Sequence, residues 1–311
     1  MRGDSGLELS EWFRDSAGAH SSEFCVGGIA VRLAGQRSTD VTLVPSLEPF
    51  RINALTSDIN IRVEWAVSLR APTRRQLFDS GSVWRLYDDE AGFQFDFSAP
   101  TLGEQPYKRL LVDRCFRRAT LQMNEKSFAH VTHTRSPLDY PLDELLIMHR
   151  LTQEKAIELH SCGIVRPDGT GNLFVGHSGA GKSTTTRLWT EREDVEVLSD
   201  DRIIVREAQA GSGMRMYGTP WHGEAAYASP GSAPVTRIFI LEHGRGNVLT
   251  RLSPSQAVAE LFARSFVPFH RHEYVDSALE FLQEVVAGVP CYRYAFEPNP
   301  SAVERIAEIR D

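Results

Sequence analysis

Alternating apolar and polar residues dominate the first part of the chain. Between residues 59 and 69 every second position is apolar, which gives one buried and one largely solvated face and predicts a β-strand. Residues 84–86 and 93–97 alternate in the same way around the turn-like segment 88–92, as expected of a β-hairpin. Prolines recur between positions 45 and 141 and leave little room for long helices. Residues 1–136 are therefore predicted to form a β-rich domain.

After residue 136 the chain changes to a mixture of helical and strand periods. From Leu142 the apolar residues up to position 157 lie largely on one helical face, which predicts a helix of roughly four turns. The other elements expected here are a strand ending near Val165, a strand at 172–175, a helix at 183–189, strands on either side of residues 200–201, a capped helix from Ser253, a helix at 274–286 and a last helix after Pro300. Residues 137–311 are predicted to form a second, α/β domain.

Residues 176–183 read GHSGAGKS and fit the pattern G-x-x-x-x-G-K-[ST] between an apolar strand and a helix. Glycines let successive backbone N–H groups converge on phosphate oxygens at a helix N-terminus. Lys182 is expected to reach the β- and γ-phosphates of ATP, and Ser183 or Thr184 to bind the bridging Mg²⁺. The alternative is a glycine turn that binds no ligand, but such a turn does not need a strand before it and a helix after it. The residues predicted to bind ATP are Gly176, His177, Ser178, Gly179, Ala180, Gly181, Lys182, Ser183 and Thr184.

Two adjacent carboxylates, Asp200 and Asp201, stand between two strand-like segments downstream of this loop. Such a pair can divide its work, with one group holding Mg²⁺ and the other accepting a hydroxyl proton. A type I turn, which favours Asp in any case, is the alternative. Because adjacent charges couple, the division of roles within the pair stays open.

Other candidates are more isolated. His160 stands at a helix-to-strand junction, where a lone histidine is usually structural. In the loop 218–224, Glu224 could complete a magnesium site and His222 or Trp221 could contact a substrate, although a turn packed around a buried Trp221 explains the same residues. Residues 270–272 (His-Arg-His) lack a matching carboxylate or cysteine and are interpreted as a solvated loop.

The order of His160, the loop at 176–183 and the Asp200–Asp201 pair resembles the carboxy-terminal catalytic domain of HPr kinase/phosphorylase, over residues 142–290. The resemblance implies an α/β P-loop domain, similar to the nucleotide-binding part of phosphoenolpyruvate carboxykinases, behind the β-rich amino-terminal domain. It also implies catalysis by Asp200 with His160 and Lys182, and puts Ser183 and Asp201 on the magnesium side. His177 and Thr184 stand where HPr kinases typically carry acidic residues, and GTPWHGE replaces their R-G-x-G segment. Both departures are closer to the broader HPr-kinase-like group, some of whose members phosphorylate a serine of a lasso precursor peptide.

The expected function is therefore that of a kinase, which transfers the γ-phosphoryl group of Mg-ATP to a hydroxyl, and serine in a protein or peptide is the acceptor considered first. Two alternatives remain: an ATP-gated binding or regulatory protein without transfer, and a kinase for a small hydroxyl metabolite. Residues 1–136 are expected to dock the acceptor or a partner chain. Reverse phosphorolysis and a homo-oligomer are left open.

Composition and charge narrow the list of partners. A net charge of −7 and a pI near 5.8 disfavour nucleic acid. No apolar run approaches the ~18–20 residues of a membrane span, and the first residues lack a signal core, so a cytoplasmic protein without a membrane partner is expected. The 4 cysteines show no CxxC spacing, which predicts thiols rather than a disulfide framework or a zinc site.

Overall fold

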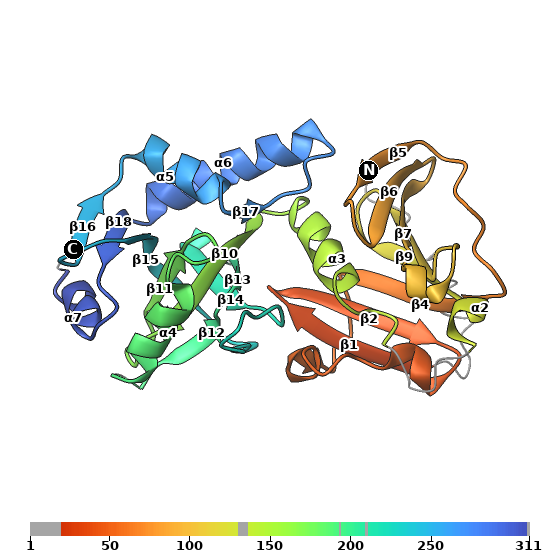
Figure 1. The fold of residues 1–311 in the computed structure, drawn as a ribbon, viewed down its shortest axis with the longest axis horizontal. Helices are drawn as coiled ribbons and strands as arrows, with labels where there is room; N and C mark the ends of the chain where they lie inside the picture. The colour runs from red at the N-terminus through yellow and green to blue at the C-terminus, as the bar shows by residue number, and fades with distance from the viewer. Residues whose placement is uncertain (1–19, 130–135, 193, 209–210, 310–311) are drawn as a thin grey trace. The chain divides into compact units, whose positions relative to one another are not determined.

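The computed structural model describes residues 20–129, 136–192, 194–208 and 211–309 (Figure 1). They form two compact units, one containing residues up to Phe24 and Ala30–Leu142, the other containing Cys25–Ile29 and the chain from Asp143 onward. The boundary thus lies six residues beyond the predicted one at 136, and a short early segment groups with the second unit. None of the described helices is long and apolar enough to cross a membrane.

The described part of the first unit is built on one mixed sheet with the strand order β3-β1-β2-β4-β9-β8-β7-β6-β5. Strand β4 pairs in parallel with both β2 and β9, whereas β5 to β9 form antiparallel pairs. The strands are β1 (His20–Val26), β2 (Ile29–Gly35), β3 (Arg51–Ile52), β4 (Ile59–Ala66), β5 (Gln76–Asp79), β6 (Trp84–Asp89), β7 (Gly92–Phe97), β8 (Lys108–Asp113) and β9 (Arg118–Asn124). Short helices lie at Ser38–Val41, Glu48–Phe50, Pro100–Leu102 and α2 (Glu125–Phe128).

The two strand predictions for this unit are confirmed. Ile59, Ile61 and Val63 of β4 are buried, as the apolar period requires, but Asn60 is buried as well, Trp65 is half-buried, and the strand ends at Ala66 rather than at 69. β6 and β7 form the predicted hairpin, but Asp89 pairs directly with Gly92, so the connection is tighter than the expected five residues. Gly92 is needed for this geometry, because a Cβ atom there would lie 1.9 Å from the carbonyl oxygen of Val112 on the neighbouring strand β8.

In the second unit, strands close into a ring in the order β11-β10-β13-β14-β15, with β15 pairing back to β11 in parallel. Strand β18 continues from β15 in parallel and β16 follows it, while β12 and β17 pair with β10. The strands are β10 (Ala156–Val165), β11 (Gly171–Val175), β12 (Glu196–Ser199), β13 (Arg202–Glu207), β14 (Met214–Gly218), β15 (Ser232–His243), β16 (Val248–Arg251), β17 (Ser265–Phe266) and β18 (Cys291–Phe296).

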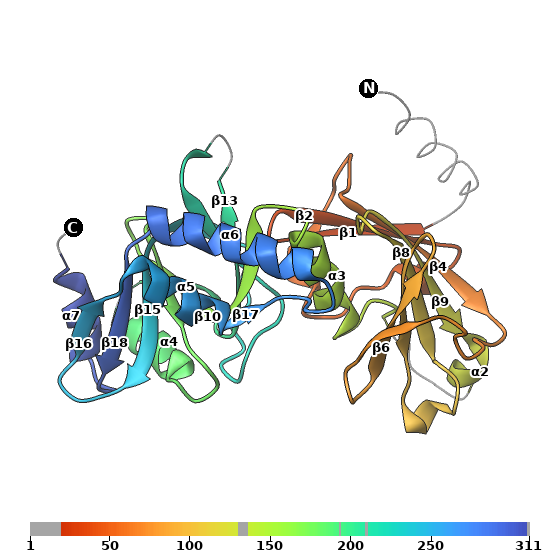
Figure 2. The same ribbon diagram turned by 90° about the horizontal axis from the view of Figure 1, so that it is seen from above.

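Helices cover both faces of the parallel strands β11 and β15. Alternate residues of these strands enter two different apolar clusters: Ile238 and Ile240 pack with helices α5 (Pro254–Phe262) and α6 (His272–Gly288), whereas Phe239 packs with α4 (Lys182–Thr190) and α7 (Ser301–Ala307). Figure 2 shows α5 and α6 side by side along this unit. Strands buried on both faces explain why their sequences read as continuous apolar runs.

The helix expected from Leu142 is shorter than predicted. Helix α3 (Leu142–Leu151) ends at Leu151, and Ile157 belongs to β10. The last turn closes when the N–H and hydroxyl of Thr152 both donate to the carbonyl of His149, after which the chain turns into the sheet. The other predicted elements are confirmed, including the capping box at Ser253 and the end of α6 at Gly288. In the described part of the chain, Cys25, Cys115, Cys162 and Cys291 form no disulfide bond.

Candidate active site

The glycine-rich segment 176–183 connects the end of β11 to the start of α4 (Figure 1). Gly179 and Gly181 have φ angles of +81° and +102°, which only glycine adopts without strain. A Cβ atom at Gly181 would lie 2.7 Å from the ring of Phe296, whereas the space around Gly179 is open. Since α4 begins at Lys182, the amides of this segment lie at a helix N-terminus, which is the setting of an anion-binding loop.

The carboxyl ends of three parallel strands meet at this loop. β11 runs directly into it, β18 ends at Phe296 under Gly181, and β15 ends at His243, whose Nε2 donates a 2.7 Å hydrogen bond to the carbonyl of Gly179. The carboxyl edge of a parallel sheet is where α/β proteins bind ligands. Within the loop, His177, Ser178, Gly179 and Ser183 are exposed, Ala180, Gly181 and Thr184 are half-buried, and Gly176 and Lys182 are buried.

The Lys182 side chain folds back across the loop and is only 6 % exposed. Its Nζ donates to the carbonyls of Gly176 (3.0 Å) and His177 (3.3 Å) and lies 2.7 Å from His160 Nε2. The same atom is 3.6 Å from Asp201 Oδ1. Burial lowers the pKa of Lys182, and the negative charge of Asp201 opposes that effect.

His160 reaches this cluster because β10 changes partners at that residue. Residues 156–160 pair with β13, and residues 161–165 pair with β11. The His160 amide donates to Arg264 and its carbonyl accepts from Gly176, which ties the base of the glycine loop to β10. In the side chain, Nε2 is 2.7 Å from Lys182 Nζ and 2.8 Å from Asp201 Oδ1. One ring nitrogen can accept from the ammonium or donate to the carboxylate, but not both at once, so these three groups compete for one proton.

Asp200 and Asp201 form the whole connection between β12 and β13, and their side chains have different surroundings. Although burial acts to raise it, the hydrogen bond from His160 and the charge of Arg202 hold the pKa of Asp201 below its usual value. Asp200 is 1 % exposed, and its two oxygens accept the backbone N–H groups of Gly223 (3.0 Å) and Ala225 (2.9 Å). The structure therefore places Asp201 beside the Lys182 ammonium and Asp200 beneath the loop that follows β14.

That loop, residues 218–225, is fixed at several points. The buried Trp221 donates its Nε1–H to Asp143 (2.9 Å), and Thr219 donates its hydroxyl to the Arg202 carbonyl (2.8 Å). Trp221 is thus the anchor of a packed turn, while the side chains of His222 and Glu224 are exposed. No described residue forms an ion pair or hydrogen bond with the Glu224 carboxylate.

Within the described ranges, no group of three or more His, Cys, Asp or Glu side chains could hold a metal ion. Mg²⁺ in nucleotide sites needs no such cage, because one or two protein oxygens act together with phosphate oxygens and water. The exposed hydroxyl of Ser183, at the second position of α4, and the carboxylate of Asp201 fit this small requirement.

Several residues around Asp201 were not predicted from the sequence. Arg202 binds the second oxygen of Asp201, and its Nε donates to Glu144 Oε1 on α3 (2.9 Å). The guanidinium lies over the ring of Phe266 at 4.1 Å. Arg202 stands next to the Asp pair in the sequence, but Glu144 is 58 positions away, and no local pattern links them.

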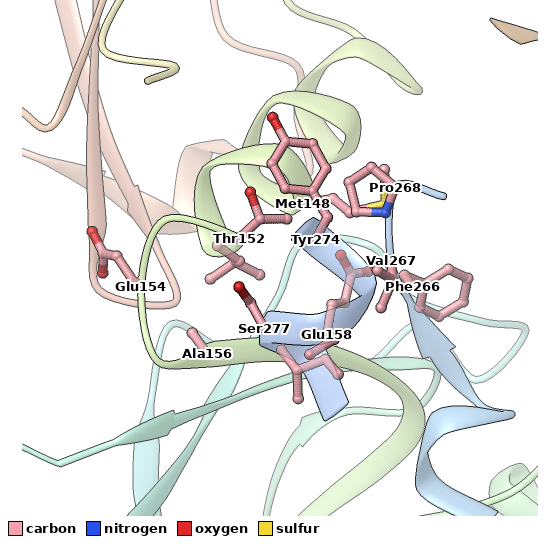
Figure 3. A pocket seen from close by; sticks show the side chains of 13 residues that line it. Met148, Thr152, Glu154, Ala156, Glu158, Phe266, Val267, Pro268, Tyr274 and Ser277 are labelled. Atoms are coloured by element: carbon pink, nitrogen blue, oxygen red, sulfur yellow. The ribbon is translucent and has the colours of Figure 1, made fainter. Parts of the chain in front are cut away.

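Glu158, on β10, is completely buried and lines a small cavity together with Phe266, Tyr274 and Ser277 (Figure 3). The cavity has a volume of about 20 Å³, room for about one water molecule. It is too small for a nucleotide or a peptide side chain. It is therefore not a candidate substrate site.

The interpretation of residues 270–272 as a solvated loop is wrong for His270. Its ring packs 5.2 Å from that of His149 and 5.4 Å from that of Tyr274. Burial and the nearby charge of Arg271 lower the pKa of His270 to about 4. His272, in contrast, is exposed at the start of α6.

Comparison with known proteins leaves the chain without an assigned family. No model of a protein family matches it, and no curated protein does.

Proposed function

We propose that this protein is an HPr-kinase-like enzyme that transfers the γ-phosphoryl group of ATP to a hydroxyl, with serine in a protein or peptide as the acceptor. One observation carries the proposal: the ammonium of Lys182, at the end of the glycine loop, lies 3.6 Å from Asp201 Oδ1 and 2.7 Å from His160 Nε2. A cation that suits a γ-phosphate thus stands next to a carboxylate that suits a hydroxyl proton.

In the proposed reaction the amides of residues 176–183 hold the triphosphate, and Lys182 neutralises charge on the group in transfer. The acceptor oxygen forms a bond to the γ-phosphorus while the bond to the β–γ bridging oxygen breaks, and ADP leaves with that electron pair. The hydroxyl proton passes to Asp201, with His160 Nε2 2.8 Å away to share it. A Mg²⁺ ion, held by Ser183 and the phosphates, would neutralise further charge.

The proposal gives Asp200 and Asp201 other roles than the resemblance to HPr kinase implies. Catalysis was expected of Asp200 and a magnesium role of Asp201, but both oxygens of Asp200 already accept backbone N–H groups of the 218–225 loop. We therefore assign the proton to Asp201 and the fixing of the loop to Asp200. Glu224 has no part in this scheme, because its exposed carboxylate has no described partner at the loop.

Cellular setting and partner belong to the same proposal. Thiols without disulfide partners, such as Cys115, suit the reducing cytoplasm, where ATP is also abundant.

The first unit contains a large sheet, and we propose that this unit binds the protein or peptide acceptor.

The direct test measures ATP binding by calorimetry and phosphoryl transfer by mass spectrometry, with serine-containing peptides, free serine and water as acceptors. Lys182→Ala is expected to weaken ATP binding at least 10-fold. Asp201→Asn should keep ATP binding within about 3-fold and lower turnover by about 10³, or about 4 kcal/mol of barrier. Asp200→Asn should lower turnover less than Asp201→Asn does. ATP binding without transfer to any acceptor would favour the ATP-gated binding protein, and transfer to free serine alone would favour a metabolite kinase.

A further inference from the structure

Asp201 is held from both sides. Its Oδ1 faces His160 and Lys182, whereas Oδ2 forms an ion pair with the Arg202 guanidinium. The χ2 angle of an Asp side chain is broadly distributed, so partners on both oxygens narrow its range. The ion pair with Arg202 therefore fixes the plane of the Asp201 carboxylate, with one oxygen toward His160 and Lys182.

Arg202 is itself fixed by two other elements. Its Nε donates to Glu144 Oε1 on α3 at 2.9 Å, and its Cζ lies 4.1 Å from the ring centroid of Phe266 on β17. The Arg202 side chain is 16 % exposed and that of Glu144 11 %, so solvent screens this pair only weakly. A planar fork with a carboxylate on two of its edges and an aromatic ring on its face keeps little rotational freedom.

The charges around Arg202 are consistent with this role. Three carboxyl groups face one guanidinium, because Glu158 Oε1 also lies 3.6 Å from Nε. Burial first, and the nearby Glu144 second, raise the pKa of Glu158 well above its usual value, which favours the protonated form of this acid. Glu144 and Asp201 are thus the two carboxylates that hydrogen-bond to Arg202.

We propose that Arg202 is a positioning residue that turns Asp201 toward His160 and Lys182, and that Glu144 holds Arg202 in place for this purpose. The inference rests on the proposed function, in which Asp201 takes the proton. Arg202 forms no described hydrogen bond, ion pair or ring contact with residues 176–183 of the glycine loop, and its charge only adds to the effect of burial on the pKa of Lys182. Its loss should therefore affect the transfer step more than nucleotide binding.

The kinetic test compares Arg202→Met, which keeps the length of the side chain, with Arg202→Lys and Glu144→Gln. Turnover of ATP, with water or a peptide as acceptor, is expected to fall 10- to 100-fold in Arg202→Met. It should fall less in Arg202→Lys, which keeps the charge without the fork, and 3- to 10-fold in Glu144→Gln. ATP affinity should stay within 3-fold in all three. Arg305→Met is the matched control, because Arg305 forms an exposed pair with Glu308 (3.2 Å) on α7.

A second readout does not need activity. The imidazole ¹⁵N resonances of His160, assigned with His160→Gln in the full chain, report whether Asp201 still faces that ring. They should move in Arg202→Met and in Glu144→Gln, and stay in place in Arg305→Met. Unmoved His160 resonances, or a loss of ATP affinity as large as the loss of turnover, would overturn the positioning role. A wild-type protein without transfer would overturn the proposed kinase instead, while the spectra would still decide the role of Arg202.

Discussion

The buried His149 makes the free energy of unfolding of the second unit sensitive to acid. His149 is 1 % exposed, and its Nδ1–H donates to the Leu145 carbonyl at 2.7 Å. Burial first, and then the nearby His270, lower the pKa of His149 to about 3. The unfolded chain takes up this proton near pH 6.5 and the folded protein only near pH 3. The free energy of unfolding is therefore highest, as far as His149 is concerned, above pH 6.5, and it declines as the pH falls from 6.5 toward 3.

His149→Phe should therefore remove part of the acid sensitivity. From this one group the wild type is expected to lose up to about 2 kcal/mol of unfolding free energy between pH 7.5 and pH 5, which the variant keeps. Urea unfolding at the two pH values measures the difference. His272→Phe serves as the control, because His272 is exposed on α6 and its replacement should leave the pH dependence unchanged. Equal pH dependence in the wild type and His149→Phe would contradict the argument.

At the residue scale, a candidate site can be predicted from the sequence when its residues lie close together in the chain. The glycine loop is such a case, because its glycines, Lys182 and the start of α4 lie within a few positions of one another. Arg202 is the opposite case, because its partners Glu144 and Phe266 come from α3 and β17. Which aspartate faces Lys182 also depends on the 218–225 loop, whose amides bind Asp200. Only the folded chain supplies that information.

At the element scale, the 218–225 loop is held in place by the Asp200 carboxylate. Gly223 lies so close that a Cβ atom there would be 2.9 Å from Asp200 Oδ2 and 3.3 Å from Asp201 Cβ. Gly223→Ala should therefore push the loop off Asp200 and destabilise the protein by about 1–3 kcal/mol. Thermal unfolding checks this, with Gly288→Ala as control because no atom lies within 4 Å of the added methyl. Equal effects of the two changes would show that Asp200 does not hold the loop.

The prediction of helices and strands was correct where the hydrophobic period was clear. It was wrong where the end of an element depended on tertiary contacts. β4 and the β6–β7 hairpin follow from alternation, and the helix from Ser253 follows from its capping box. The helix from Leu142 was extended too far, because Ile157 fits a helical face as well as it fits β10. Residues 156–160 become a strand because β13 offers them a hydrogen-bonding edge. That edge lies more than 40 positions further along the chain, beyond any local period.

At the scale of the whole molecule, the two units are not consecutive pieces of chain. Cys25–Ile29, which comprises the end of β1, the turn at Gly27 and Gly28 and the first residue of β2, groups with the second unit. There the Gly27 carbonyl accepts a 2.6 Å hydrogen bond from Arg206 on β13. Gly27, with φ at +59°, also packs so tightly that a Cβ atom would lie 2.6 Å from Ile204 Cδ1. A chain that begins at residue 137 therefore lacks the segment that packs on Ile204 and binds Arg206 of β13.

Gly27→Ala should reproduce this defect in the full chain. The substitution adds backbone strain, about 1 kcal/mol at a positive φ, to overpacking against the completely buried Ile204, a further ~1–3 kcal/mol. Gly81→Ala separates the two contributions, since Gly81 has a similar φ of +68° but no atom within 4 Å of the new methyl.

Hydrogen exchange of the β13 amides measures the effect of Gly27→Ala within the second unit. Gly27→Ala should speed exchange at Ile204 and its neighbours, and Gly81→Ala should not. A fragment of residues 137–311 whose β13 amides exchange as slowly as in the full chain would show that Cys25–Ile29 does not stabilise β13.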